Sequence, residues 1–134
     1  MKPIIVVGAA IISGDKQEIL LVREKRSRFW IFPGGTLEEV DESVEQCLAR
    51  EIEEELPDLQ FKQRNFRILG IYPGQVSHGG RIWLIVYRVL RAGEKIRTDH
   101  EIKEAVFTDD PESFKLATAT RRAIVILRQR GYLQ

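Results

Sequence analysis

The chain has 134 residues, a length that predicts one domain, spanning residues 1–134, with one hydrophobic core. Hydrophobic residues make up 43% of the chain and aromatic residues 8%, which argues against disorder. The net charge is +1, no apolar run reaches the ~20 residues that span a bilayer, and the single cysteine excludes an internal disulfide or a cysteine-based zinc site. We therefore expect a cytoplasmic protein without a membrane partner.

The N-terminal part predicts three strands. Residues 4–12 are rich in β-branched side chains and predict a buried strand. Residues 19–22 predict the returning strand of a hairpin, after a turn at 13–16. A short apolar strand at 29–32 ends at the sequence Pro33-Gly34-Gly35.

A helix is predicted to begin near Ser43 and to end before Pro57. Ser43 with Gln46 three residues later has the spacing of a capping box. The residue before a proline disfavours helical angles, so the helix stops there. An apolar stripe with four-residue spacing marks the buried face: Val44, Leu48, Ile52 and Leu56.

The C-terminal part predicts three more strands and a second helix. The strands are expected at 66–72, 82–90 and 102–107, with a loop at 73–80, and the helix is expected at 117–130. This order of elements predicts an α+β fold, with a mixed β-sheet between α-helices.

The small net charge conceals a strongly acidic segment. Residues 38–58 hold ten carboxylates against one base, Arg50, a net charge of −9, so the remaining residues sum to +10. Such a segment is either a solvated helix face or a site for cations. The composition alone leaves both interpretations open.

Three of these carboxylates share one face of the predicted helix. At 100° per residue, Glu51, Glu54 and Glu55 fall within about 100° of arc, while Glu53 points the other way. They lie in the last turns, where the helix dipole makes each negative charge cost about 0.3–1 kcal/mol. A bound divalent cation would neutralise them, and oxygen ligands without His or Cys favour Mg²⁺ or Mn²⁺. The alternative is a surface glutamate run that ends the helix.

The residues before the helix favour a phosphate ligand. Gly34 and Gly35 let the backbone approach a ligand closely and offer free carbonyl groups. A cation held by a glycine carbonyl and glutamates, near the basic residues at 23–28, is suited to clamping a phosphate chain and activating water.

Together, Pro33-Gly34-Gly35, Glu42 and residues 50–55 resemble the Nudix box, G-x5-E-x7-R-E-U-x-E-E-x-G-U, where U is a bulky aliphatic residue. The flanking strands and helices resemble the Nudix fold, so the resemblance covers nearly the whole chain. It implies a Mg²⁺- or Mn²⁺-dependent hydrolase that cleaves a nucleoside diphosphate linked to another group, by water attack at phosphorus. The implied substrates are a nucleoside triphosphate, ADP-ribose or a dinucleoside polyphosphate.

Two other hypotheses remain beside this one. The first is a non-catalytic nucleotide or metabolite sensor on the Nudix fold. An intact set of glutamates speaks against it, because a sensor does not need a metal cluster. The second is an interaction protein with an acidic helix, which predicts no specific stabilisation by divalent ions.

The resemblance also implies roles for individual residues. The Gly35 carbonyl, Glu51, Glu54 and Glu55 are implied metal ligands, with Glu51 and Glu54 also counted as catalytic. Arg50 is implied to orient Glu51.

Glu42 is implied to be the ion-pair partner of Arg50, although the chain departs from the box here. Six residues rather than five separate Gly35 from Glu42. Either a one-residue bulge in the loop absorbs the extra residue, or Asp41 takes the place of Glu42. In addition, Pro57 replaces the glycine that follows the paired glutamates, and proline stops a helix by a different route.

The resemblance leaves the general base open between a box glutamate and a carboxylate from a later loop. Glu101 and Glu104 are the later candidates, with plain surface charge as the alternative. Arg23, Arg28 and Gly34 are candidate contacts to the phosphates.

Other side chains have weaker predictions. We expect no role for His78 and a packing role for Cys47. Four aromatic residues are expected either in the core or stacked on a base: Phe29, Trp30, Tyr72 and Trp83. The arginines of the last helix come without a nucleic-acid reading motif, so no nucleic-acid partner is expected. The resemblance allows a homodimer.

Overall fold

The structure, a computed structural model, describes residues 2–75 and 79–134. In chain order its elements are β1 (Ile4–Ala10), β2 (Ile19–Glu24), β3 (Trp30–Ile31), β4 (Gly34–Thr36), α1 (Val44–Glu55), η1 (Gln63–Asn65), β5 (Phe66–Gln75), β6 (Arg81–Val89), β7 (Ile102–Thr108), η2 (Pro111–Ser113) and α2 (Thr118–Gln129).

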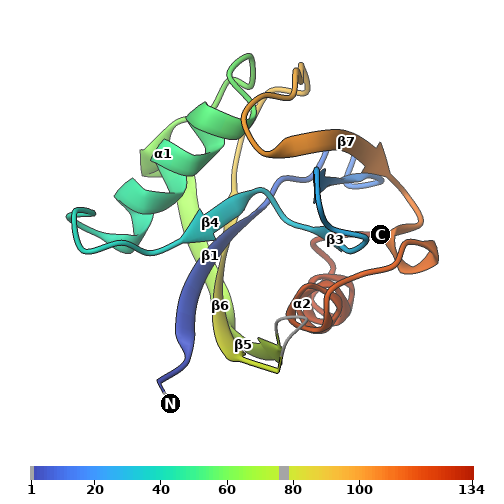
Figure 1. Cartoon of the computed structure of the whole chain (residues 1–134). Helices are drawn as coiled ribbons and strands as arrows, with labels where there is room; N and C mark the ends of the chain where they lie inside the picture. The colour runs from blue at the N-terminus through green and yellow to red at the C-terminus, as the bar shows by residue number, and fades with distance from the viewer. Residues whose placement is uncertain (1, 76–78) are drawn as a thin grey trace.

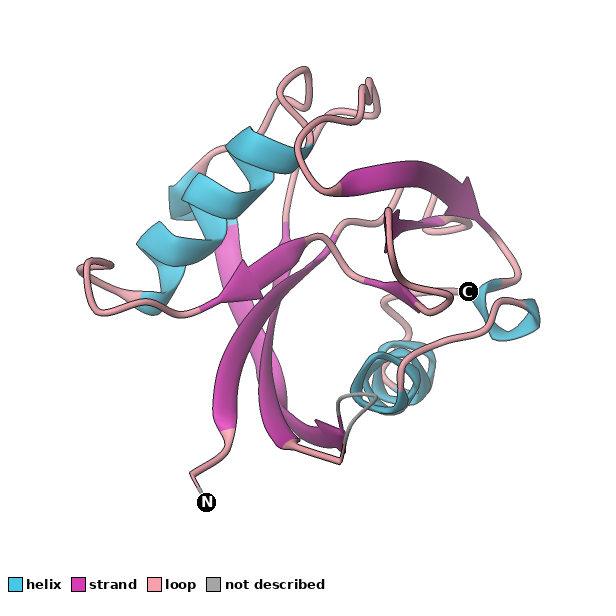
Figure 2. Ribbon diagram, viewed as in Figure 1, coloured by secondary structure: helices cyan, strands magenta, loops and turns pink. Residues whose placement is uncertain are grey.

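The strands form two sheets, and a helix packs on each side of them (Figure 1). The four-stranded sheet has the order β4-β1-β6-β5 and is mixed, because β1 and β6 run parallel while the other neighbours are antiparallel. The antiparallel three-stranded sheet has the order β3-β2-β7. Helix α1 contacts β1 and β4, and α2 contacts β5 and β6, as the ribbon in Figure 2 shows. The predicted α+β class is therefore confirmed.

The predicted hairpin over residues 4–22 is wrong beyond its turn. Pairing between its two arms is confined to the Ile12–Ile19 bridge, where the Ser13 N–H donates to the Glu18 carbonyl at 2.8 Å and the Leu20 N–H donates to the Ile11 carbonyl at 2.9 Å. Strand β1 then pairs with β4 and β6, and β2 pairs with β3 and β7. Both are interior strands, so each takes two other partners and the chain changes sheet at the turn.

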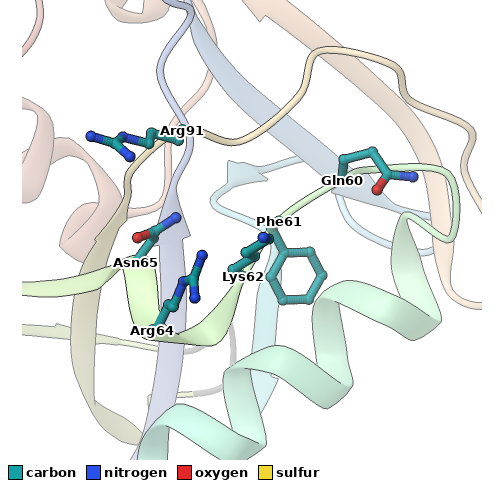
Figure 3. A pocket seen from close by; sticks show the side chains of 6 residues that line it. All are labelled: Gln60, Phe61, Lys62, Arg64, Asn65 and Arg91. Carbon is teal, nitrogen blue, oxygen red and sulfur yellow. The ribbon is translucent and has the colours of Figure 1, made fainter.

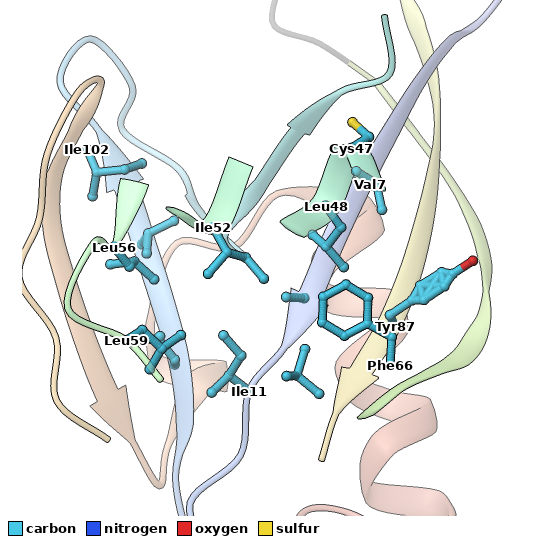
Figure 4. Packing of buried hydrophobic residues seen from close by; sticks show 14 residues of the cluster. Val7, Ile11, Cys47, Leu48, Ile52, Leu56, Leu59, Phe66, Tyr87 and Ile102 are labelled. Carbon is cyan, nitrogen blue, oxygen red and sulfur yellow. The ribbon is translucent and has the colours of Figure 1, made fainter. Parts of the chain in front are cut away.

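Two apolar clusters fill the space between the sheets and the helices. Leu20 and Val22 of β2 belong to the α1 cluster, whereas the alternate residues Ile19 and Leu21 belong to the α2 cluster. The period-2 geometry of a strand makes this alternation possible. Figure 4 shows the α1 cluster, in which Leu48, Ile52 and Leu56 of the predicted stripe are fully buried. Burying each such side chain contributes about 1.5–3 kcal/mol to the free energy of folding.

Helix α1 begins and ends where the sequence predicts. The Ser43 side chain accepts a hydrogen bond from the Gln46 N–H at 3.0 Å, which caps the first turn. At the other end, the N–H of Leu56 donates to the Ile52 carbonyl at 2.8 Å before Pro57 stops the helix. These two ends fix which face of α1 meets the sheet.

Most strand boundaries differ from the prediction by one or two residues, and two differences are larger. The three-residue strand β4 was not anticipated, because its sequence, Gly34-Gly35-Thr36, has low β-propensity. Strand β5 continues through Pro73 to Gln75, into the predicted loop at 73–80. Because β5 is an edge strand, the missing N–H of Pro73 is tolerated. His78 lies outside the described residues.

Among the described residues, neither helix has the length and hydropathy of a membrane-spanning segment.

Gly34 is the backbone position on which β4 depends most. Its φ is +153°, and a Cβ built there would lie 1.9 Å from the carbonyl oxygen of Val7. We expect Gly34→Ala to lower the free energy of unfolding by about 3 kcal/mol or more, because strain at such a φ alone costs about 1–3 kcal/mol. Urea unfolding followed by circular dichroism measures this. Gly14→Ala is the control, since nothing lies within 4 Å of its Cβ. Equal unfolding free energies for the two variants would contradict the steric argument.

Candidate active site

The candidate active site forms where β4 meets the C-terminal half of α1. The N–H of Gly34 donates a hydrogen bond to Glu55 Oε1 at 3.0 Å. A Cβ on Gly35 would lie 2.4 Å from Cδ of Glu51 and 2.6 Å from each of its carboxylate oxygens. Since only glycine leaves this space, the carboxylate rests directly against the backbone. The two contacts hold the glutamate face of α1 on β4.

Glu55 is the buried carboxylate of this site. The residue is 8% exposed, and burial raises its pKa to about 8, although the Gly34 N–H acts to lower it. The neighbouring charges of Glu51 and Glu24 contribute to this rise in the pKa. A carboxylate held in such surroundings gains from a nearby cation or from a proton. Its environment is therefore that of a desolvated carboxyl rather than of a solvated surface acid.

Arg50 is the centre of the ion-pair network on α1. Its Nε donates to Asp41 Oδ1 and its Nη2 donates to Asp41 Oδ2, both at 3.1 Å. Its Nη1 lies 3.2 Å from Glu51 Oε1 and 3.5 Å from Glu54 Oε1. The hydrogen bonds to Asp41, more than the other charges, raise the pKa of Arg50. Glu38 is a more distant partner, at 3.8 Å.

The structure corrects the expected partner of Arg50 from Glu42 to Asp41. The Asp41 side chain is 2% exposed, while Glu42 is exposed and makes no ion pair in the described part of the chain. The Glu38 N–H donates to Asp41 Oδ2 at 2.9 Å, so the aspartate closes a turn and faces Arg50. The extra residue of the box thus lies between Asp41 and α1. The Arg50 hydrogen bonds, followed by the Glu38 N–H, lower the pKa of Asp41.

The remaining residues of α1 follow the predicted faces. The Glu54 side chain is 39% exposed and is paired with Arg50, whereas Glu53 is exposed and makes no ion pair with a described residue. Cys47 is fully buried, and burial raises the pKa of its thiol to about 12, so it packs in the core as predicted.

Glu24 was missed by the sequence reasoning. It ends β2 at a β-bulge that follows Arg23. The charge of Glu24 raises the pKa of Glu55, and partial desolvation and then the charge of Glu101 raise the pKa of Glu24 itself. Carboxylates from β2, from α1 and from the segment before β7 therefore interact. One feature of the sequence could have pointed to Glu24: it is the single acidic residue among the basic residues at 23–28.

The two later candidate bases lie in different surroundings. The carbonyl of Glu101 accepts a hydrogen bond from the Lys25 N–H at 2.8 Å, and its charge acts on Glu24 at the edge of the α1 glutamates. Glu104 forms an ion pair with Arg23 across the β2–β7 pairing. The structure thus brings Glu101 toward the box carboxylates and commits Glu104 to an arginine.

The two candidate phosphate-binding arginines also differ. The Arg23 side chain is 18% exposed, donates from Nη1 to the Ser27 carbonyl at 2.8 Å, and lies 5.9 Å from the Trp30 ring centre. Arg28 is exposed, without a hydrogen bond or ion pair to a described residue. The Trp30 ring packs edge-on against Phe114, so it serves the core.

The residues of the site fit a hard divalent cation. Among the described residues, no three His, Cys, Asp or Glu side chains lie close enough together to form a metal centre. Glu51 and Glu54 instead form ion pairs with Arg50. The donors available beside Gly35 are oxygens, with no imidazole and no exposed thiol among them. This donor chemistry, and the buried Glu55, suit Mg²⁺ or Mn²⁺.

Comparison with known proteins gives the family. The chain matches the NUDIX domain over residues 2–129. No curated protein matches it. Among solved structures, it is similar to the Escherichia coli ORF135 protein, with 31% identity, a TM-score of 0.73, and 97% of this chain and 94% of that chain covered. It is also similar to a MutT NUDIX hydrolase from Burkholderia pseudomallei, with 25% identity, a TM-score of 0.75, and 95% and 99% covered.

A third similar structure is a bifunctional NMN adenylyltransferase/ADP ribose pyrophosphatase from Francisella tularensis, complexed with AMP and a Mn ion. Identity is 20% and the TM-score is 0.77, with 96% of this chain and 42% of that chain covered. At this identity the similarity shows the fold alone.

The match across nearly the whole chain shows that the chain belongs to the NUDIX domain family. With the glycines and glutamates of the Nudix box brought together on β4 and α1, it is a Nudix hydrolase.

The Asp41–Arg50 pair predicts a pH-dependent stability. Because the pKa of Asp41 is lowered in the folded state, the pair stabilises the protein above the unfolded pKa of about 3.9 and is lost as the pH falls through the folded value. We expect Asp41→Asn to lower the Tm at pH 7, with the difference from the unmodified protein shrinking in acid. Glu42→Gln is the control and should leave the Tm unchanged. A larger effect of Glu42→Gln would show that the expected pairing was correct after all.

Proposed function

We propose that this Nudix hydrolase cleaves a nucleoside diphosphate linked to another group, using Mg²⁺ or Mn²⁺. The observation that carries the proposal is the contact of β4 with α1. It places the Glu51 carboxylate on Gly35 and binds Glu55 to the Gly34 N–H. A buried carboxylate beside a half-exposed group of like charges is an arrangement that a divalent cation and a phosphate chain would stabilise.

The proposed metal ligands are the Gly35 carbonyl and the carboxylates of Glu51, Glu54 and Glu55. When bound, the metal supplies Lewis-acid activation of the phosphate and of the attacking water. Arg50 holds Glu51 and Glu54 through the contacts at 3.2 and 3.5 Å, and is itself held by Asp41. In this arrangement Arg50 is a positioning residue.

Proton transfer from the attacking water needs a carboxylate that is not held by an arginine. Of the two later candidates, Glu101 meets this condition, because Glu104 is engaged by Arg23. We therefore propose Glu101 as the general base and Glu104 as the residue that positions Arg23. Glu24, whose pKa is raised by partial desolvation and by Glu101, lies beside the proposed base.

The substrate phosphates would be held by cationic side chains beside the metal ligands. Arg28 is free to reach a ligand, and Arg23 would do so by exchanging Glu104 for a phosphate oxygen. The Gly34 N–H is already used by Glu55, so its role is to hold the ligand carboxylate rather than the substrate.

The proposal is tested by incubating the protein with nucleoside triphosphates, ADP-ribose, nucleotide sugars and dinucleoside polyphosphates. Each reaction is run with Mg²⁺, with Mn²⁺ and with EDTA, in ¹⁸O-labelled water. We expect metal-dependent cleavage of one substrate class, with one ¹⁸O atom in a phosphate of the products. Tight nucleotide binding without turnover would instead establish a sensor. No binding, no turnover and no metal-dependent rise in Tm would leave the acidic-helix interaction protein.

Two neighbouring glutamates offer a matched pair of variants. Glu54→Gln removes a proposed ligand, and we expect turnover to fall about a hundredfold or more, since even partners of metal ligands cost 10–100-fold when replaced. The Tm should stay the same or rise, because repulsion within the carboxylate cluster is relieved. Glu53→Gln removes the same charge from the opposite face and should leave turnover unchanged. Turnover by Glu54→Gln equal to that of Glu53→Gln would exclude Glu54 as a ligand.

A further inference from the structure

A second concave site lies along the connection between α1 and β5. It has a volume of about 290 Å³. Six residues line it: Gln60, Phe61, Lys62, Arg64, Asn65 and Arg91. We call it the basic pocket. Figure 3 shows Arg64 and Asn65 on the η1 segment, Lys62 just before it, and Arg91 beyond the end of β6. It shares no lining residue with the candidate active site.

The charge of the basic pocket is unbalanced. Three of its side chains are cationic, none is a carboxylate, and Lys62, Arg64 and Arg91 make no side-chain ion pair or hydrogen bond with a described residue. The surrounding sequence reinforces this, because residues 59–93 contain six Arg and Lys and no Asp or Glu. Three exposed cationic side chains around one concavity attract anions, and a bound anion would reduce the repulsion among them.

The backbone around the basic pocket is fixed from two directions. The Leu90 N–H donates to the Asn65 carbonyl at 3.0 Å, and the Gly93 N–H donates to the Gln60 carbonyl at 2.7 Å. Phe61 stacks on Phe66 at 5.9 Å between ring centres, which ties the wall of the pocket to the α1 cluster. The cations are therefore presented by a preorganised backbone, which lowers the entropic cost of binding.

We propose that the basic pocket binds a small phosphate-class anion, such as phosphate, diphosphate or the terminal phosphates of a nucleotide. The guanidinium groups of Arg64 and Arg91 can each donate two parallel hydrogen bonds to a phosphate, and Lys62 adds a point charge. The amides of Gln60 and Asn65 offer further N–H donors. The volume lies at the lower end of ligand pockets, about 300 Å³, which suits a diphosphate better than a dinucleotide. This site is separate from the proposed hydrolysis and does not depend on it.

The test uses ¹⁵N-labelled full-length protein titrated with pyrophosphate in EDTA, so that no metal recruits the anion to the glutamates. We expect the amide signals of residues 60–65 and 91–93 to shift, and binding to weaken as salt is added. The double variant Lys62→Gln/Arg64→Gln should raise the Kd at least about tenfold. The control Lys2→Gln/Arg121→Gln removes the same charge from exposed side chains elsewhere and should keep the Kd.

Two further titrations identify the source of the anion. Equal Kd values for pyrophosphate and ATP would identify a free anion as the ligand. A lower Kd for ATP would identify the phosphate tail of a nucleotide as the ligand. Both outcomes support the proposal. Shifts confined to residues 34–36 and 51–55 would overturn it, and so would equal Kd values for the two double variants. Tighter binding of a short single-stranded RNA through the same amides would also overturn it, in favour of a nucleic-acid surface.

Discussion

The position of the box glutamates depends on one backbone donor, the N–H of Gly34, which donates a hydrogen bond to Glu55 at 3.0 Å. That donor is aimed by a strand of three residues, whose pairing with β1 sets Gly35 opposite Val7. The other side of the contact is fixed by α1, whose apolar stripe is buried in the cluster that also contains Val7. The core therefore determines where the glutamates lie, and the glycines determine how closely the backbone approaches them.

The second constraint is electrostatic. Glu51, Glu54 and Glu55 share a helix face near the negative end of the helix dipole, where each charge is unfavourable. Arg50 offsets part of this repulsion, and the buried Asp41 holds Arg50 through two hydrogen bonds of 3.1 Å. Arg50 forms ion pairs with Glu51 and Glu54 but not with Glu55. Burial therefore keeps the pKa of the Glu55 carboxyl raised, to about 8. The protein thus stabilises the cluster enough to fold, while Glu55, one of the proposed metal ligands, stays buried with its pKa raised.

The sequence was sufficient to predict the features that depend on neighbouring residues in the chain. Helix α1 was predicted from its cap, its stripe and Pro57, and the box glutamates followed from helical periodicity. Strand pairing was not local: β1 and β2 looked like a hairpin, although each takes two partners from elsewhere. Glu24 was missed for the same reason, because only the tertiary fold brings the end of β2 to α1. Likewise, spacing alone left Asp41 and Glu42 as alternatives, and a turn closed by Glu38 decided between them.

Opposite charges follow one another along this chain, and the fold joins them physically. The acidic segment at 38–58 is followed directly by residues 59–93, which contain no acid. The connection from β6 to β7 bonds to both: Gly93 donates to Gln60 at 2.7 Å, and Asp99 donates to the Glu55 carbonyl at 3.0 Å. The same connection ends at Glu101, the proposed base. An anion held at the basic pocket would therefore rest on backbone that is hydrogen-bonded, through the β6–β7 connection, to the last turn of α1.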